Sequence, residues 1–302
     1  MILLAALSMF WLEIEPTGHG VGDDKRVVLI AADPEYRSEQ AMPQLARIFA
    51  RHGFQCTVLF AQDPAGTVNP THTGLVPGLS KLENADLCVL MARFQHWADR
   101  DMRHFAKYVA AGKPLIALRT STHAFAYPAD SQSEFKSWSW DQPDGGFGRR
   151  VLGETWVAHW GRHGAEGTRA TPVGDHPVLR GVGPIEVSTD AYEAHPPASA
   201  QVLLRGANMA GLAAGSPLVN DPKRGPMPVA WIPAVRARVL TTTMGSSRDL
   251  LDANFRRLLL NAAAWAVGRT ANGKEDVGLV GDYRPSEWCF GKHRVGVPVA
   301  DH

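Results

Sequence analysis

The chain has 302 residues, of which 45% are hydrophobic and 20% are charged, and its formal net charge is +1. This composition is typical of a globular protein with one large α/β domain or two smaller ones. A net charge so close to zero provides no electrostatic basis for binding nucleic acid or an anionic membrane surface, so neither is expected as a partner.

The first twelve residues are strongly apolar, and a polar, glycine-rich stretch follows them up to residue 24. This pattern resembles the hydrophobic region of a signal peptide, but it has neither a basic segment before it nor a clear Ala-x-Ala cleavage site. The alternative is an N-terminal helix that packs on the domain. Both interpretations stay open; a periplasmic or secreted location is placed ahead of a cytoplasmic one. The run is too short for a membrane span, and no other stretch would suffice.

Residues 25–118 alternate apolar runs with helical patterns. Strands are predicted over residues 25–32, 54–60, 85–92 and 115–118, and helices over residues 38–52 and 99–111. We expect Ser38 to cap the first helix and Gly53 to end it. Strands and helices in this order predict a parallel sheet with right-handed crossovers.

Residues 115–118 form a short apolar run behind Gly-Lys-Pro, which is typical of a central strand buried on both faces. The run stops at a polar cluster that contains Arg119, Thr120, Ser121 and His123. In open α/β sheets the ligand crevice lies outside the carboxyl ends of the strands. The cluster therefore marks the predicted active-site edge.

Residues 125–165 interrupt the alternation and contain four of the nine tryptophans, including Trp156 and Trp160. An insertion after a central strand is expected to lie over the carboxyl edge as a lid or wall. Tryptophan faces suit the apolar face of a sugar ring, although tryptophan also fills cores without any ligand. The clustering of four tryptophans within residues 125–165 favours a surface on which a sugar ring stacks.

The rest of the domain is predicted to contain further strands and one long helix, with strands over 185–189, 201–205, 228–232 and 238–243 and the helix over 249–267. Ser247 is expected to cap that helix, and an anion site on the amides of residues 246–248 is the alternative. Residues 270–302 lack periodicity, so we expect an extended tail that wraps the domain or a neighbouring subunit of a homo-oligomer. The chain thus divides into residues 1–24, 25–269 and 270–302.

Several strings in this order resemble the ThuA-like (trehalose utilisation) family of the class I glutamine amidotransferase-like superfamily. They occupy residues 112–125, 152–161, 176–181, 189–192, 228–231 and 238–245. The resemblance implies an α/β, flavodoxin-like, mostly parallel sheet with helices on both faces. It also implies a carbohydrate substrate, namely an oxidised disaccharide or glycoside that carries a 3-keto group.

The sequence departs from the amidotransferases where their chemistry resides. Those enzymes place a cysteine on the turn after the strand equivalent to residues 114–118, with a histidine and a glutamate after a later strand. Here the turn reads Arg119-Thr120-Ser121, so glutamine hydrolysis is excluded. Many ThuA-like proteins have His-Ser where this chain has Arg119-Thr120, so the chemistry is expected to differ even within the family.

Arg119 needs a partner, because an unpaired guanidinium at the end of a buried strand is too costly. Either a salt bridge to Glu154 or Asp190, or a substrate oxygen held by its fork, would meet that need. His123 is a candidate for proton transfer, with a hydrogen-bonded structural role as the alternative. Asp190 and Tyr192 follow a predicted strand and would orient a histidine or bind a hydroxyl group.

His159 and His163 are four residues apart, so a helix would place both rings on one face, as a metal pair requires. Gly161 lies between them and argues against that helix. A third ligand, such as His123 or Asp190, would complete a zinc or manganese site. Otherwise the two histidines are polar wall residues.

The leading hypothesis is an enzyme that acts on small 3-keto glycosides by base-assisted cleavage or isomerisation. His123 or His159 would be the base, and Arg119 or a metal would stabilise the oxyanion. The rival hypothesis is a non-catalytic sugar-binding or assembly module. An enzyme should bring Arg119, His123, His159 and Asp190 into one pocket, whereas a module would leave them scattered or paired internally.

Overall fold

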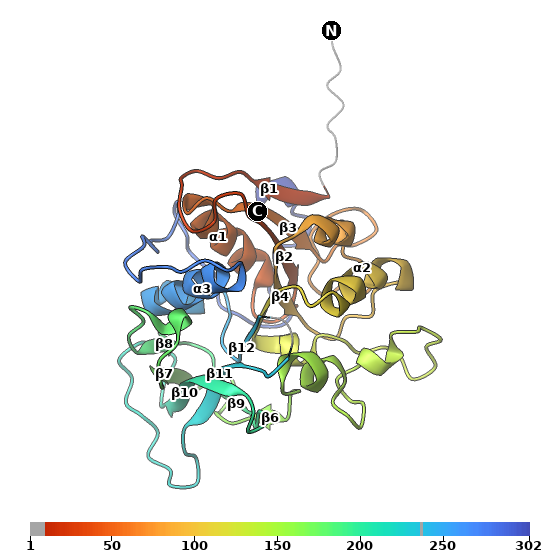
Figure 1. The fold of residues 1–302 in the computed structure, drawn as a ribbon. Helices are drawn as coiled ribbons and strands as arrows, with labels where there is room; N and C mark the ends of the chain where they lie inside the picture. The colour runs from red at the N-terminus through yellow and green to blue at the C-terminus, as the bar shows by residue number, and fades with distance from the viewer. Residues whose placement is uncertain (1–9, 236–237) are drawn as a thin grey trace.

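The computed structural model describes residues 10–235 and 238–302 (Figure 1). One ten-stranded sheet runs through the molecule in the order β1-β3-β2-β4-β5-β12-β11-β10-β7-β8. Its central strands are parallel and comprise β3 (Gln55–Phe60), β2 (Arg26–Ala32), β4 (Leu87–Ala92), β5 (Leu115–Leu118) and β12 (Val239–Thr242). This parallel core confirms the predicted flavodoxin-like α/β fold.

Antiparallel strands extend the core at both edges. On one side lie β11 (Met227–Ile232), β10 (Gln201–Met209), β7 (Gly167–Pro172) and β8 (Ile185–Val187). On the other side β1 (Trp11–Ile14) pairs with β3. Sequence analysis predicted neither β1 nor β7. Residues 1–9 lie outside the described part of the chain, so the signal-peptide interpretation stays a prediction.

Helices cover both faces of the sheet (Figure 1). On one face, α1 (Ser38–Arg51) and α3 (Ala253–Ala266) share a hydrophobic cluster with the strands, and on the other face α2 (Asp99–Ala110) packs into a second cluster. Every residue of β4 and β5 is buried, which explains their unbroken apolar sequences. In the described ranges, no helix is both long and apolar enough to cross a membrane.

Two predicted helix caps are wrong. The hydroxyl of Ser38 bonds to the backbone N–H and C=O of Asp33, both at 3.0 Å, and α1 begins after Arg37 without a side-chain cap. The helix expected from residue 249 starts only at α3, where Asp252 caps it by accepting from the Phe255 N–H at 2.9 Å. The alternative anion site on the amides of residues 246–248 is not open, because the Ser246 N–H donates to Asp249 and the Ser247 N–H donates to the Tyr36 carbonyl, both at 3.0 Å.

The C-terminal segment, residues 270–302, lies along its own domain. Its residue Val280 bonds to Gln44 of α1, and Ser286 bonds to Gln40. The last turn, η7 (Val299–Asp301), buries Val299 close to β1. The segment therefore passes from α3 along α1 to the β1 edge of the sheet.

Candidate active site

Polar side chains gather at the carboxyl edge of the parallel strands, as expected for an open α/β sheet. Glu35 and Tyr36 follow β2, Arg93 follows β4, and Arg119 begins the short 3₁₀ turn after β5. The antiparallel half and the insertion provide the remaining members of the cluster, which are His159, His163, Asp190 and Tyr192.

A buried ion pair lies at the centre of this cluster. Arg119 and Asp190 are 0% and 1% exposed, and Nη2 of Arg119 donates to Oδ1 of Asp190 at 2.8 Å. Arg119 also donates to the Asp190 and Thr243 carbonyl oxygens and to the Tyr36 hydroxyl. Of the two partners considered for Arg119, Asp190 is the one that the structure places here, while Glu154 pairs with Arg149.

Two tyrosine rings pack against the guanidinium group of Arg119. The guanidinium carbon lies 3.8 Å from the ring centroid of Tyr192 and 4.6 Å from that of Tyr36. Its φ of +45° is in the left-handed region, which is uncommon for a residue with a side chain. Arg119 is therefore built into the interior, where it holds Asp190 in place.

A two-stranded ribbon brings His159 to Asp190. β6 (Ala158–His159) pairs antiparallel with β9 (Tyr192–Glu193), so His159 lies opposite Tyr192. Nδ1 of His159 is 2.8 Å from Oδ2 of Asp190. His159 and His163 do not share a helix in this described segment. A turn at Gly161 instead brings their ring centroids to 4.4 Å from each other. A Cβ on Gly161 would lie 2.7 Å from Asp190 Cβ, so only glycine fits.

His163 connects Asp190 with Glu35. Its Nε2 is 2.9 Å from Glu35 Oε1, and its Nδ1 is 3.5 Å from Asp190 Oδ1. Hydrogen bonds to Asp190 and Glu35 raise the pKa of His163 to about 9, so its ring is cationic at neutral pH. Burial alone would raise the pKa of Asp190, but the charge of Arg119 and the hydrogen bonds from both histidines hold it well below its usual range.

His123 lies behind this cluster, 3% exposed, with its ring 6.0 Å from Tyr192 and 5.6 Å from Trp156. Burial, followed by the nearby charges of Arg93 and Arg119, lowers its pKa well below the usual value. His123 is therefore a neutral residue beneath the surface of the site.

The other residues predicted from sequence divide into two groups. Trp156 lies beside the cluster, with its ring 6.0 Å from His159. Thr120 and Ser121 are buried and bond to Asp33 and to the Leu90 carbonyl, and Trp160 bonds to the Gly225 carbonyl. These last three side chains hold neighbouring segments together.

Aromatic side chains surround the polar cluster and form what we call the aromatic rim, which consists of Phe94, Trp140, Trp156, Trp288 and Phe290. None of them is fully buried. The first three form a chain with ring centroids 5.7 Å apart at each step. The ring of Trp288 lies 5.1 Å from that of His163.

Sequence analysis missed Glu35, Arg93 and most of the rim. Glu35 lies three residues after the end of β2 and Arg93 directly follows β4, so the edge rule applied to β5 would have found them as well. No local pattern places Trp288 or Phe290 in the site, because they belong to the aperiodic C-terminal segment.

The donor set fits a divalent metal ion. One nitrogen each from His159 and His163 and one oxygen from Asp190 lie within 4.8 Å of one another. Two imidazoles and a carboxylate are typical ligands of zinc and related metals. The histidine side chains are 32% and 36% exposed, so an ion could reach them from solvent. His163 would have to release its proton to become a ligand.

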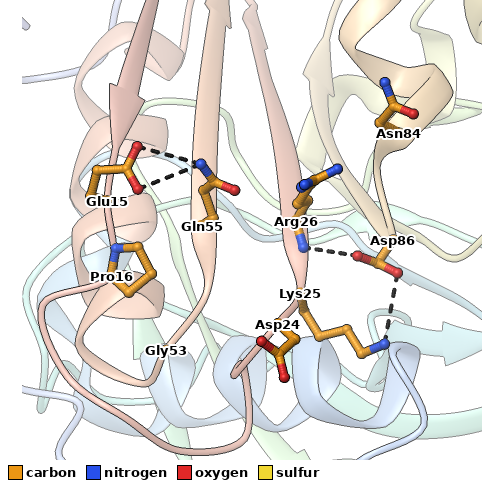
Figure 2. Close-up of a pocket in the computed structure, with 9 residues that line it drawn as sticks. All are labelled: Glu15, Pro16, Asp24, Lys25, Arg26, Gly53, Gln55, Asn84 and Asp86. Atoms are coloured by element: carbon orange, nitrogen blue, oxygen red, sulfur yellow. Dashed lines mark hydrogen bonds and ion pairs between the residues drawn. The ribbon is translucent and has the colours of Figure 1, made fainter.

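A separate pocket of about 590 Å³ opens at the amino edge of the sheet (Figure 2). Arg26 and Asp86 are joined there by a hydrogen bond, and Lys25 pairs with Asp86. The candidate site is at the carboxyl edge instead, because that is where open α/β sheets bind their ligands and where the titratable side chains converge.

Together these features define an open α/β protein of the flavodoxin-like class with a polar, aromatic-walled site at the carboxyl edge of its sheet. The chain belongs to the ThuA family, described as trehalose utilisation, whose model matches residues 26–266.

Solved structures agree with this assignment at the level of the fold. A ThuA-like protein from Parabacteroides merdae is 15% identical with a TM-score of 0.53, and the match covers 88% of this chain and 97% of that one. A ThuA-like protein from Bacteroides uniformis is 13% identical with a TM-score of 0.51, covering 86% and 95%. No match was found among curated proteins.

Proposed function

We propose that this protein is a carbohydrate-processing enzyme that acts on oxidised, 3-keto disaccharides or glycosides by base-assisted cleavage or isomerisation. The observation that carries the proposal is the Asp190 carboxylate, which holds His159 on one side and the buried Arg119 on the other. Membership in a trehalose utilisation family supports a carbohydrate as the substrate.

His159 is the general base of the proposed reaction. The hydrogen bond from its Nδ1 to Asp190 fixes the ring and leaves Nε2 for the substrate, which is how a carboxylate positions a catalytic histidine. A ketone at C3 acidifies the C2 proton. His159 removes that proton. The resulting enediolate then expels the group at C1, which takes the proton from His159 as it leaves, or the enediolate is itself reprotonated to give the isomer.

His163 stabilises the enediolate in this scheme. Its cationic ring lies 4.4 Å from the His159 ring, so it provides a positive charge where negative charge develops. Arg119 and Asp190 are positioning residues, because both are buried and reach the substrate only through the histidines. His123, which is neutral and buried, supports the wall at Trp156.

The aromatic rim supports a sugar as the substrate. Flat rings such as Trp140 and Trp156 pack well on the apolar face of a pyranose. The planes of these two rings are at 70° to each other, so the rings form a corner rather than a single flat platform. A small glycoside would sit in that corner beside His159.

A divalent metal, zinc or manganese, is the alternative source of positive charge. It would be held by His159, His163 and Asp190, whose donor atoms lie within 4.8 Å of one another. When bound, it would polarise the keto oxygen as a Lewis acid. His159 would then be a ligand, and another group would have to be the base.

A non-catalytic sugar-binding module is the second candidate function. The internal pairing of Arg119 with Asp190 favours it, since paired charges need no substrate. The partial exposure of His159 and His163 supports the enzyme, because a binding module has no need for titratable groups that solvent can reach.

The first experiment compares wild type with His159→Ala and the double variant His159→Ala, His163→Ala. Metal content is measured by elemental analysis, and activity by the release of nitrophenolate from a 4-nitrophenyl 3-keto-glucoside. We expect His159→Ala to lower kcat by about 10²–10⁴-fold, which is the usual contribution of a general base. His104→Ala is the control, because His104 is 29% exposed but lies on α2.

The outcomes separate the alternatives. Near-stoichiometric metal that is lost in the double variant would assign the histidines as ligands. Metal-free protein with nitrophenolate release that depends on His159 would support the acid–base scheme. Equal activity in wild type and His159→Ala would contradict the proposed base, and the absence of turnover with retained sugar binding would favour the module.

A further inference from the structure

Arg93 stands out among the charged residues at the carboxyl edge because of its surroundings. Its guanidinium carbon lies 4.3 Å from the ring centroid of Phe94 and 4.7 Å from that of Phe290. The Arg93 side chain is 23% exposed. Phe94 has a φ of +50°, a strained conformation for an aromatic residue and one that clusters at functional sites.

The hydrogen-bonding capacity of Arg93 is largely unused. Within residues 10–235 and 238–302, its only polar side-chain contact is Nε to Glu35 Oε2 at 3.9 Å, which is too long for a hydrogen bond. Its Nε is buried without a hydrogen-bond partner. By comparison, Arg119 donates four hydrogen bonds to protein acceptors. A half-buried guanidinium with free donors is typical of a residue that awaits an acceptor from a ligand.

Glu35 places Arg93 in the same network as the proposed catalytic histidines. One oxygen of Glu35 is 2.9 Å from His163, and the other faces Arg93. Charges therefore alternate along Arg93, Glu35, His163 and Asp190. A ligand oxygen on Arg93 would lie beside the polar cluster and inside the aromatic rim.

We propose that Arg93 binds a substrate oxygen that carries or develops negative charge, and that Phe290 fixes the plane of its guanidinium group. This inference rests on the proposed function for the identity of the substrate. Phe290 lies beyond residues 26–266, which the family model matches, so the C-terminal segment adds a specificity-determining wall to the site.

The chemistry of arginine suits this position beside Phe94 and Phe290. A guanidinium whose carbon lies 4.3 Å and 4.7 Å from two ring centroids is restrained by both rings, and its unbonded N–H groups can donate to a carboxylate or an enediolate. A lysine would keep the charge but lose both the stacking and the fork geometry.

The C-terminal segment is anchored on both sides of Phe290. Before it, the Tyr283 hydroxyl donates to the Ser247 carbonyl at 2.8 Å, and the Ser286 N–H donates to Gln40 at 2.9 Å. After it, the Val297 carbonyl accepts from the Val68 N–H at 3.1 Å. The segment that carries Phe290 is therefore held to the domain on both sides.

The test compares Arg93→Lys and Phe290→Leu with two controls, Arg100→Lys and Leu251→Ala. Arg100 is an exposed arginine on α2, and Leu251 is 48% exposed, as is Phe290. With the 4-nitrophenyl 3-keto-glucoside, we expect Arg93→Lys to lower kcat/KM by about tenfold or more and Phe290→Leu by about threefold, with both controls within twofold. A lower kcat would show that the substrate oxygen bound by Arg93 gains its negative charge during the reaction. A weaker affinity would show that the oxygen already carries that charge when the substrate binds.

Binding is measured separately, so that failure of the proposed function is distinguishable. Cys289 is adjacent to Phe290 and is the exposed one of the three cysteines. We expect a ligand that occupies this wall to slow the reaction of Cys289 with a disulfide reagent. Glucuronate should slow the reaction in wild type, glucose should do so less, and Arg93→Lys should weaken the glucuronate effect about tenfold.

If no 3-keto-glucoside is turned over but glucuronate protects Cys289 through Arg93, the proposed reaction fails and the inference stands for a carboxylate ligand. If Arg93→Lys equals wild type in turnover and in protection, the inference is overturned. It is overturned equally if wild type shows neither turnover nor protection.

Discussion

Asp190 is the residue on which the geometry of the site depends. It holds His159 at 2.8 Å, lies 3.5 Å from His163 and neutralises the fully buried Arg119. A buried charge that loses its partner is strongly destabilising, because water cannot replace the lost interaction.

We therefore expect Asp190→Asn to lower the free energy of unfolding by about 3–5 kcal/mol, in addition to any loss of activity. Denaturant unfolding measures this change. Asp175→Asn, at an exposed position, should change stability by less than about 0.5 kcal/mol. A loss of under about 1 kcal/mol at Asp190 would mean that Arg119 finds another acceptor.

Physical reasoning from the sequence predicted the pairing of Arg119 with Asp190 but not the arrangement of the residues around them. A guanidinium at the end of a buried strand requires a carboxylate, and Asp190 was one of two candidates for that reason. His159 and His163 were paired on the assumption of helical spacing, whereas a ribbon and a turn at Gly161 produce the contact. Their proximity is a property of the tertiary fold, which four-residue spacing alone does not determine.

The start of α3 provides a test at the level of a single element. Asp252 accepts from the N–H of Phe255 at 2.9 Å and from the N–H of Glu186 at 2.9 Å, so it joins the helix to β8. Ser247, the residue expected to be the cap, is buried with a hydroxyl that has no partner among the described residues.

We expect Asp252→Ala to lower the free energy of unfolding by about 1–2 kcal/mol, because a cap and a loop contact are lost together. Ser247→Ala should have an effect within about 0.5 kcal/mol, because it removes a buried hydroxyl that is not hydrogen-bonded. Thermal unfolding of both variants checks the pair, and equal losses would show that Ser247 stabilises the turn after all.

Elements were predictable where one physical signal dominates. The parallel strands are buried on both faces, so their apolar runs are unambiguous. β7 has the sequence Gly-Thr-Arg-Ala-Thr-Pro and packs mainly through Ala170, so no apolar run or clean alternation marks it. β1 was hidden within an N-terminal apolar stretch that also resembles a signal sequence.

At the scale of the whole molecule, the C-terminal segment lies over the beginning of α1. A buried carboxylic acid there, Glu39, is not part of the candidate active site. Glu39 is 3% exposed, its Oε1 accepts from Arg37, and its Oε2 has no partner within the described ranges. Burial raises the pKa of Glu39 from 4.5 to about 7, even though Arg37 acts in the opposite direction.

This shift makes the stability of the whole chain depend on pH. The folded state retains a proton on Glu39 that the unfolded state releases above pH 4.5. The contribution of Glu39 to the free energy of unfolding is therefore fully present below that pH. It is lost as the pH rises through about 7, and the total change is on the order of 3 kcal/mol.

Glu39→Gln removes this titration, because glutamine carries no proton to exchange. We expect the free energy of unfolding of wild type, relative to that of Glu39→Gln, to fall as the pH is raised from 4.5 to 8, whatever the constant offset caused by loss of the Arg37 pair. Denaturant unfolding of both proteins at several pH values measures the difference, with the 89% exposed Glu287→Gln as a control that should run parallel to wild type. Parallel curves for wild type and Glu39→Gln would show that Glu39 is ionised in the folded state, where its ion pair with Arg37 at 2.6 Å would stabilise the charge.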